Sequence, residues 1–240
     1  MRQFSIILSI TALLHPLLSG AQTTGSYRQH AEYEPTEAVW MLYPQIIHKR
    51  NFPTAVVTAN MIKTLAPYVK IKLVVQNDSI EQLARNMLPA TILANGTVTI
   101  FKFPYQEFWA RDMGPAFVVN SKGQKAIADF NFSDWGYNDT ADAAARLDEK
   151  LDEHIAAHYK IPTISTTLVS EGGNREINSK GTLLLVEAVE KQRNPGLTLE
   201  QMEPELRCFS TAATNSKVPL LFISRLPPSE TSVVDIVGIL

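Results

Sequence analysis

The feature that most constrains the fold is the alternation of short apolar runs with segments of helical spacing. Runs of apolar and β-branched residues at 39–43, 71–75 and 98–103 predict short buried strands. Between these runs, apolar residues recur three and four positions apart at 53–65 and 80–87, which predicts two helices. Strands that alternate with helices in this order place the chain in the α/β class.

The second half of the chain continues the alternation and adds a hairpin. The elements predicted there are strands at 116–120, 125–130, 166–169 and 182–186, one long helix at 140–159 with Leu147, Leu151 and Ile155 as its buried stripe, and a helix-like stretch at 199–207. A Ser-Lys-Gly turn at 121–123 joins the first two of these strands. Hairpins argue against one doubly wound sheet, so we expect small mixed sheets repeated around an axis.

The helix predicted at 53–65 also carries a prediction about its buried side. Val56, Val57, Met61 and Leu65 fall on one side at helical spacing. Large apolar residues are the usual contacts between a helix and its sheet, so this side is expected to face the core.

Composition and charge exclude several classes of protein. The chain has 240 residues, of which 45% are hydrophobic and 19% charged, the profile of a soluble globular protein with a substantial core. Its 22 basic and 24 acidic residues are spread along the chain and give a formal net charge of −2. No basic stripe suggests a nucleic-acid partner, and no charge run suggests an interaction tail. A near-neutral surface therefore favours small molecules or peptides as partners.

Residues 1–21 have the pattern of a secretory signal peptide. Arg2 supplies a positive charge, Phe4–Leu14 is almost purely apolar, and small residues at 19–21 offer a cleavage point. The apolar run is too short to span a bilayer. We therefore expect a secreted or extracytoplasmic protein with no membrane attachment once the signal is removed; the alternative is a buried N-terminal helix.

Cysteine and histidine give few options for thiol or metal chemistry. Cys208 is the only cysteine, which excludes an internal disulfide. His154 and His158 share a helix face, a spacing that can bind a metal, but no third ligand with suitable spacing accompanies them. We therefore predict no metal site, a helix-surface or core-edge position for both histidines, and an inert thiol at Cys208.

The densest chemical signal is the sequence FWARDMGP at 108–115, which follows a predicted strand. A carboxylate and an aromatic ring at a strand end can hold a planar cation. The carboxylate of Asp112 can pair with two N–H groups of a guanidinium, and the indole of Trp109 can attract the cation. The competing interpretation is a core tryptophan beside a local ion pair between Arg111 and Asp112.

A second signal is the sequence EGGN at 171–174, between two predicted strands. Two glycines let the backbone bend sharply and approach a ligand closely, which would place Glu171 over a pocket. The competing interpretation is a plain β-turn with a solvated glutamate.

Together these motifs resemble the agmatine deiminase and bacterial-type peptidyl-arginine deiminase family, part of the guanidine-modifying superfamily. The matching blocks, in chain order, are AEYEP at 31–35, VWMLYP at 39–44, WARDMGP at 109–115, DFNF at 129–132, WG at 135–136, EGGN at 171–174, GTLL at 181–184 and RNP at 193–195. Their order and spacing agree with the family from Ala31 to about Arg207. Single blocks are modest signals, whereas the ordered set is a strong one.

The resemblance implies a pentein fold, a propeller-like arrangement of five small α/β units around a pseudo-axis that carries the site. It implies hydrolysis of a guanidinium to a ureido group and ammonia, through a cysteine nucleophile and a proton-shuttling histidine, with no metal or organic cofactor. By motif match, Asp112 and Glu171 would be the catalytic carboxylates that hold the guanidinium, and Trp109 and Asn174 would be further substrate-binding residues. The expected partner is a small guanidinium substrate or a peptidyl arginine.

The sequence departs from the family near residue 207. The family continues with a Gly-His-x-Asp segment and a late nucleophilic cysteine, whereas no histidine follows His158 here. We therefore expect a partial deiminase domain at 22–207, incomplete at its C-terminus and inactive alone, and a divergent tail at 208–240 that is loose or adds one strand. An incomplete gene product is the favoured explanation. A degenerate paralogue or remnant that only binds guanidinium, and a missing half supplied by a second chain, are the alternatives.

Two substrates compete within the family. The peptidyl-arginine branch holds the carboxylate of the peptide with arginines shortly after the aspartate motif, whereas the stretch 130–137 contains no Arg or Lys. Charge therefore favours a ligand without a carboxylate, such as agmatine, although the predicted signal peptide favours an exported role. The sequence predicts no oligomeric state.

Overall fold

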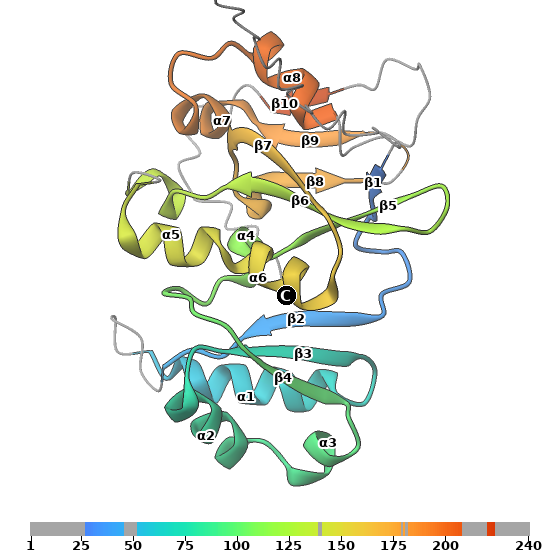
Figure 1. Ribbon diagram of the computed structural model, residues 1–240, viewed down its shortest axis with the longest axis vertical. Helices are drawn as coiled ribbons and strands as arrows, with labels where there is room; N and C mark the ends of the chain where they lie inside the picture. The colour runs from blue at the N-terminus through green and yellow to red at the C-terminus, as the bar shows by residue number, and fades with distance from the viewer. Residues whose placement is uncertain are drawn as a thin grey trace, which may run out of the picture.

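Three β-sheets, with helices packed against and between them, make up the described part of the computed structural model (Figure 1). The structure describes residues 27–45, 52–138, 141–178, 180, 182–207 and 220–223. The signal peptide predicted at 1–21 and the thiol of Cys208 lie outside these residues, so both stay predictions. None of the described helices has the length and apolar character needed to cross a membrane.

The first sheet is wholly parallel, with the crossover helices on one side of it (Figure 1). Its strands, in spatial order, are β2 (Ala38–Leu42), β3 (Lys70–Val75) and β4 (Val98–Lys102). Its helices are α1 (Thr54–Leu65), α2 (Asp78–Met87) and α3 (Ala90–Ala94). Parallel strands need such crossovers, which explains the strict alternation seen in this part of the sequence.

The buried side of α1 agrees with the prediction only in part. Met61 and Leu65 are half-buried and pack against the core, whereas Val56 and Val57 are 45% and 52% exposed. The fully buried apolar residues of the helix are Ala55, Ala59 and Ile62. Small alanine side chains let the helix axis approach the sheet closely, so the helix is turned away from the two valines.

The second and third sheets combine antiparallel and parallel pairs. The second has the order β1 (Tyr27–Gln29), β5 (Ala116–Asn120), β6 (Lys125–Asn131) and β7 (Thr163–Val169). The third has the order β8 (Arg175–Ile177), β9 (Leu183–Val186) and β10 (Leu220–Ile223). The predicted hairpin is β5–β6, and β10 pairs in parallel with β9. Small mixed sheets are therefore confirmed for these two, and the tail does add a strand.

The helix predicted at 140–159 is two helices. α5 (Ala143–Glu149) and α6 (Leu151–Tyr159) are separated at Lys150, whose ψ of 2° leaves the helical range. The predicted apolar stripe does not continue across this break. Leu151 and Ile155 are accordingly buried as predicted, whereas Leu147 is 40% exposed.

The remaining helical segments are short. They are α4 (Ala110–Met113), the 3-10 turns η1 (Asp134–Gly136) and η2 (Gly172–Asn174), α7 (Glu187–Arg193) and α8 (Leu199–Arg207). Of these, only α8 was predicted, because the others are too short to show a helical period.

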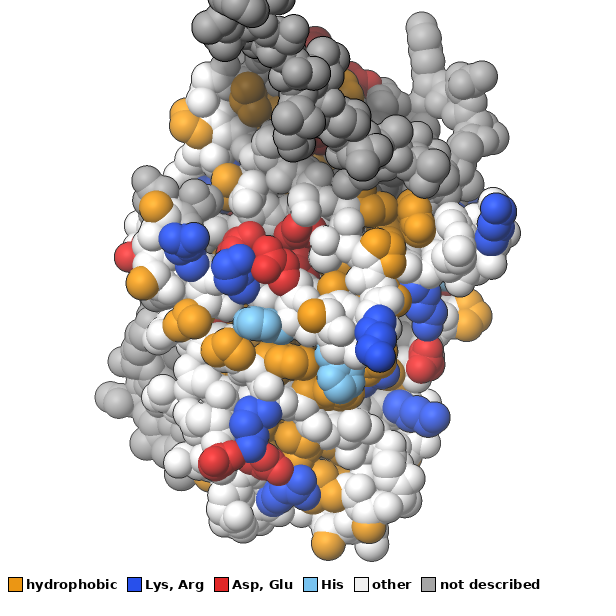
Figure 2. All heavy atoms as spheres, in the orientation of Figure 1, with side chains coloured by type: hydrophobic (Ala, Val, Ile, Leu, Met, Phe, Trp, Pro, Cys, Tyr) orange, Lys and Arg blue, Asp and Glu red, His pale blue; other side chains and the backbone are white. Residues whose placement is uncertain are grey.

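α6 lies between the first and second sheets and carries the two histidines (Figure 1). His154 stacks on Phe103 with ring centroids 5.9 Å apart, and His158 meets Phe101 edge-on at 5.1 Å. Figure 2 shows histidine side chains among hydrophobic ones over this helix. The predicted helix-surface or core-edge position is confirmed: His154 is half-buried and His158 is exposed.

Candidate functional site

The two sequence motifs meet in space, where α4 packs against η2. α4 carries Asp112, and η2 begins directly after Glu171. Neither glycine of the second motif leaves room for a side chain. A Cβ at Gly172 would come closer than 3.0 Å to the Arg111 carbonyl oxygen, and one at Gly173 equally close to the Asp112 carboxylate. The glycines are therefore required by close approach rather than by an unusual φ.

Asp112 lies at this junction. Its carboxylate accepts the Gly173 N–H at 3.0 Å, and the side chain of Trp135, whose one donor is the indole N–H, lies near enough to lower its pKa. Burial raises the pKa of Asp112, the Trp135 and Gly173 donors lower it, and the negative charge of Glu171 raises it further. Two carboxylates within electrostatic reach create a negative potential that a cation would relieve.

Glu171 is buried and already engaged by a guanidinium of the chain itself. Its side chain is 7% exposed, and its carboxylate accepts two hydrogen bonds from Arg193, from Nη2 at 2.7 Å and from Nε at 3.1 Å. This is the bidentate fork that guanidinium and carboxylate groups favour. The interpretation of Glu171 as a solvated turn residue is therefore wrong.

Arg111 does not form the local ion pair that the competing interpretation of the first motif requires. Its guanidinium pairs with Glu32 and, at 2.5 Å, with Glu176. These pairs tie α4 to the segment after β1 and to β8. The carboxylate of Asp112 is left to the N–H donors of the site.

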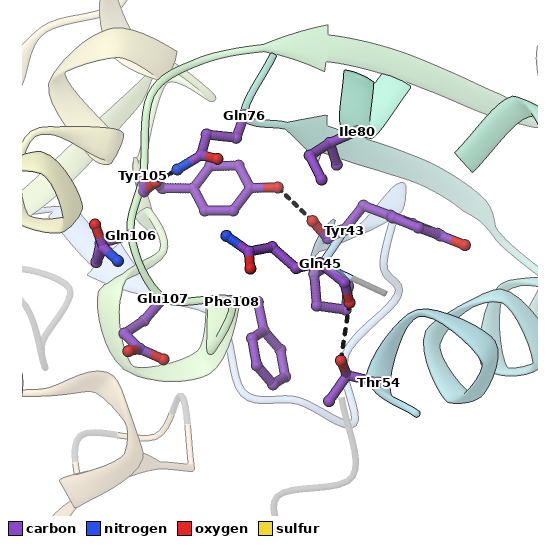
Figure 3. A pocket seen from close by; sticks show the side chains of 10 residues that line it. Tyr43, Gln45, Thr54, Gln76, Ile80, Tyr105, Gln106, Glu107 and Phe108 are labelled. Atoms are coloured by element: carbon purple, nitrogen blue, oxygen red, sulfur yellow. Dashed lines mark hydrogen bonds between the residues drawn. The ribbon is translucent and has the colours of Figure 1, made fainter. Parts of the chain in front are cut away.

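Trp109 is 47% exposed and stacks on Phe108 at a centroid distance of 4.7 Å, so it is not a core tryptophan. Beyond Phe108 lies a hollow of about 60 Å³ at the carboxyl ends of β2, β3 and β4 (Figure 3). Figure 3 shows the Gln45 side chain between Tyr105 and Phe108 in this hollow. Because neither Asp112 nor Glu171 lines it, the hollow is not where a guanidinium would meet the two carboxylates.

Asn174 holds the loop of the second motif in place. Its Nδ2 donates to Glu190 Oε1 at 2.8 Å, and its Oδ1 accepts the Val186 N–H at 3.2 Å. Glu190 is fully buried and also accepts the Ser170 hydroxyl at 2.8 Å. These contacts support a structural role, and the substrate-binding role of Asn174 stays a prediction without support from the geometry.

Ionisable side chains from α5, α6 and β8 lie beside Asp112. A small polar cavity joins Asp112 to Glu149, Asp152 and Arg175. Burial raises the pKa of Asp152 to about 9, and the negative charge of Asp129 contributes to the rise. Among the described residues, no group of His, Cys, Asp or Glu is arranged to hold a metal ion.

The raised pKa of Asp152 predicts a pH-dependent stability. The folded chain retains a proton up to about pH 9 that an unfolded chain releases near pH 4, so the free energy of unfolding falls as pH rises between these values. Asp152→Asn mimics the protonated carboxyl and should remove this loss. In urea titrations at pH 5 and pH 8, the free energy of unfolding of the variant should rise relative to that of the parent by up to about 1.4 kcal/mol per pH unit. Glu153→Gln, a change at the exposed neighbour, is the control; a constant difference at both pH values would contradict the prediction.

The small α/β sheets are arranged as in solved deiminases of the pentein fold. The protein therefore has this fold, as the sequence resemblance implied. The sequence model of the Porphyromonas-type peptidyl-arginine deiminase family matches residues 28–214. The chain therefore belongs to that family.

Individual relatives agree with this assignment. Agmatine deiminase of Medicago truncatula is 27% identical over 208 residues, which are 80% of this chain and 53% of the relative. The solved agmatine deiminase of Enterococcus faecalis is 26% identical, with a TM-score of 0.67 over 77% of this chain and 50% of that one. A substrate-bound agmatine deiminase of C. jejuni, 19% identical with a TM-score of 0.61 over 75% of this chain and 52% of that one, supports the fold alone. The chain spans about half the length of the curated relatives that it matches.

The structure places Asp112 and Glu171 within electrostatic reach of each other, leaves Trp109 at the surface and commits Asn174 to the loop. The guanidinium-binding roles of Asp112, Glu171 and Trp109 stay predictions. Sequence reasoning missed Arg193, which holds Glu171. Its RNP block was noted for its resemblance, but no local pattern shows that an arginine 22 positions away reaches a glutamate.

Proposed function

We propose that this chain supplies the guanidinium-binding carboxylates of a guanidine deiminase, and that it takes a ligand of the agmatine type. The observation that carries the proposal is the meeting of Asp112 and Glu171 at the contact between α4 and η2. The family membership and the agmatine deiminases among the relatives support it.

The geometry suits a planar cation. Asp112 is partly buried, lacks an ion pair with the adjacent Arg111 and feels the charge of Glu171. An arriving guanidinium would supply the counter-charge that Asp112 lacks, and its parallel N–H groups fit a carboxylate edge. Trp109 is exposed three residues before Asp112, and the family resemblance would give its indole face the role of packing on the same cation.

Deimination consumes one water: a guanidinium and a water give a ureido group and an ammonium ion, so atoms and charge balance. The step requires a nucleophile for the guanidinium carbon and a group that moves protons. Among the described residues, the donors that act on the carboxylates of Asp112 and Glu171 belong to Gly173, Trp135 and Arg193, and none of them is a histidine or a cysteine. We therefore propose that this chain alone binds the guanidinium without releasing ammonia.

The choice of an agmatine-type ligand rests on charge. The turn beside the two carboxylates, at 133–138, carries no lysine or arginine that could hold a carboxylate on the ligand. Arg193, which packs against this turn, has two of its nitrogens committed to Glu171. A ligand that carries a carboxylate would therefore meet unpaired negative charge and bind less well.

Titration calorimetry with a matched set of ligands tests the proposal. Agmatine should bind. Putrescine, which has an amine in place of the guanidinium, should bind at least about tenfold more weakly. Arginine should bind more weakly than agmatine because of its carboxylate. An ammonia assay on the same samples should stay at background.

Three results would contradict parts of this picture. Equal heats for agmatine and putrescine would remove the guanidinium specificity, and tighter binding of arginine would reverse the choice of ligand. Ammonia release by the chain alone would show that it carries a complete set of catalytic groups.

A further inference from the structure

A strained turn after β6 contacts both parts of the site. Asp134, Trp135 and Gly136 have successive φ angles of 47°, 57° and 76°, all in the left-handed region. Residues with a Cβ adopt this region in succession only where the surrounding structure determines it, and such strain is concentrated at functional sites. Here the Ser133 hydroxyl accepts the Gly136 N–H at 3.2 Å, and Asp134 Oδ2 accepts the Asn138 amide at 2.6 Å.

The first contact of this turn is with Asp112. The indole N–H of Trp135 lowers the pKa of that carboxylate, and the indole ring meets Phe132 edge-on at a centroid distance of 5.2 Å. The edge-on contact fixes the ring plane, and the ring plane fixes the direction of the indole N–H. The unusual backbone at Trp135 is therefore coupled to the orientation of the Asp112 carboxylate.

The second contact is with the arginine that holds Glu171. A Cβ at Gly136 would lie 2.7 Å from Arg193 Nη1, so only glycine leaves the guanidinium its place. Nη1 donates to Gln192 at 2.8 Å, while Nε and Nη2 hold Glu171. Arg193 is thus fixed on three sides at the end of α7.

We propose that the turn at 133–138 and Arg193 form one positioning device, in which Trp135 orients Asp112 and Arg193 orients Glu171 for the ligand. The inference rests on the proposed function. It adds two residues, Trp135 and Arg193, that act on the carboxylates and do not touch the ligand. A carboxylate has about four lone-pair sites, so the fork with Arg193 leaves Glu171 able to accept further donors. The burial of Arg193 and its contact with Gln192 favour this role over that of a cation that occupies the site and competes with the ligand.

Trp135→Phe removes the N–H and keeps an aromatic ring against Phe132. Because the hydrogen bond from Trp135 lowers the pKa of Asp112, the variant should raise it. Carboxyl ¹³C NMR titration, with the Asp112 signal assigned by its loss in Asp112→Asn, measures this without any ligand. Agmatine binding should then be lost at a higher pH than in the parent. Trp40→Phe, at another half-buried tryptophan, should change neither value.

Arg193→Lys keeps the positive charge and removes the fork, and Arg193→Ala removes both. Agmatine binding should weaken by about tenfold in the lysine variant and further in the alanine variant, since a lysine cannot hold a carboxylate bidentately. Tighter binding in either variant would show that Arg193 competes with the ligand and would overturn the proposal.

The two arms separate this proposal from the proposed function. An unchanged Asp112 pKa in Trp135→Phe overturns the positioning role whatever the chain binds. If Trp135→Phe raises the pKa of Asp112 but the protein binds no guanidinium, the contact between Trp135 and Asp112 is supported and the proposed function is refuted.

Discussion

Gly172→Ala is expected to destabilise the fold by about 3 kcal/mol, because the added methyl group has no space to enter and no flexible neighbour to displace. The atom it would meet is the backbone carbonyl oxygen of Arg111, closer than 3.0 Å. Arg111 is itself tied to Glu32 and Glu176, so α4 cannot move away without breaking ion pairs. The contact between the two motifs would open, and urea denaturation would report the loss.

Gly123→Ala is the matched control for this change. Gly123 has a φ of +76°, and a methyl group there would meet no atom within 4 Å. Alanine at this position therefore carries only the cost of a left-handed residue, about 1–2 kcal/mol. The two variants thus separate steric closeness from backbone conformation. If Gly172→Ala reduced the free energy of unfolding by no more than Gly123→Ala, α4 and η2 would not be in tight contact.

The general plan of the fold could be predicted because its signals are local. The strands β3 and β4 and the helices α1 and α2 each carry their own apolar period, and the β5–β6 hairpin carries its own turn. What the sequence could not show was the direction in which elements face. In α1 the tight packing of Ala55 and Ala59 decided the buried side, and in the segment 140–159 the break at Lys150 split the stripe.

The candidate site was predictable in part for the same reason. Asp112 and Glu171 lie in compact motifs whose glycines indicate a close approach, and the structure joins them through the Gly173 N–H. The residues that hold them come from other elements. Arg193 belongs to a helix that was not predicted, and the left-handed backbone of Trp135 has no sequence signature, because non-glycine residues rarely adopt it.

The two carboxylates are expected to respond differently to neutral substitutions, because only one of them has an ion-pair partner. Glu171→Gln leaves the guanidinium of Arg193 buried without its counter-charge, which should reduce stability by about 3 kcal/mol. Asp112→Asn removes a carboxylate whose pKa is raised by burial, so the free energy of unfolding should fall little or rise slightly.

Asp112→Asn should have a large effect on ligand binding, although its effect on stability is small. Agmatine binding should weaken by about 10- to 150-fold, since a hydrogen bond to a charged partner contributes about 1.5–3 kcal/mol. Calorimetry and urea denaturation of the same preparation would separate the two effects. Asp78→Asn, an exposed change on α2, should leave agmatine binding unaltered. If Asp112→Asn bound agmatine as tightly as the parent while unfolding more easily, Asp112 would be a structural residue, and the guanidinium would have to be held by Glu171 alone.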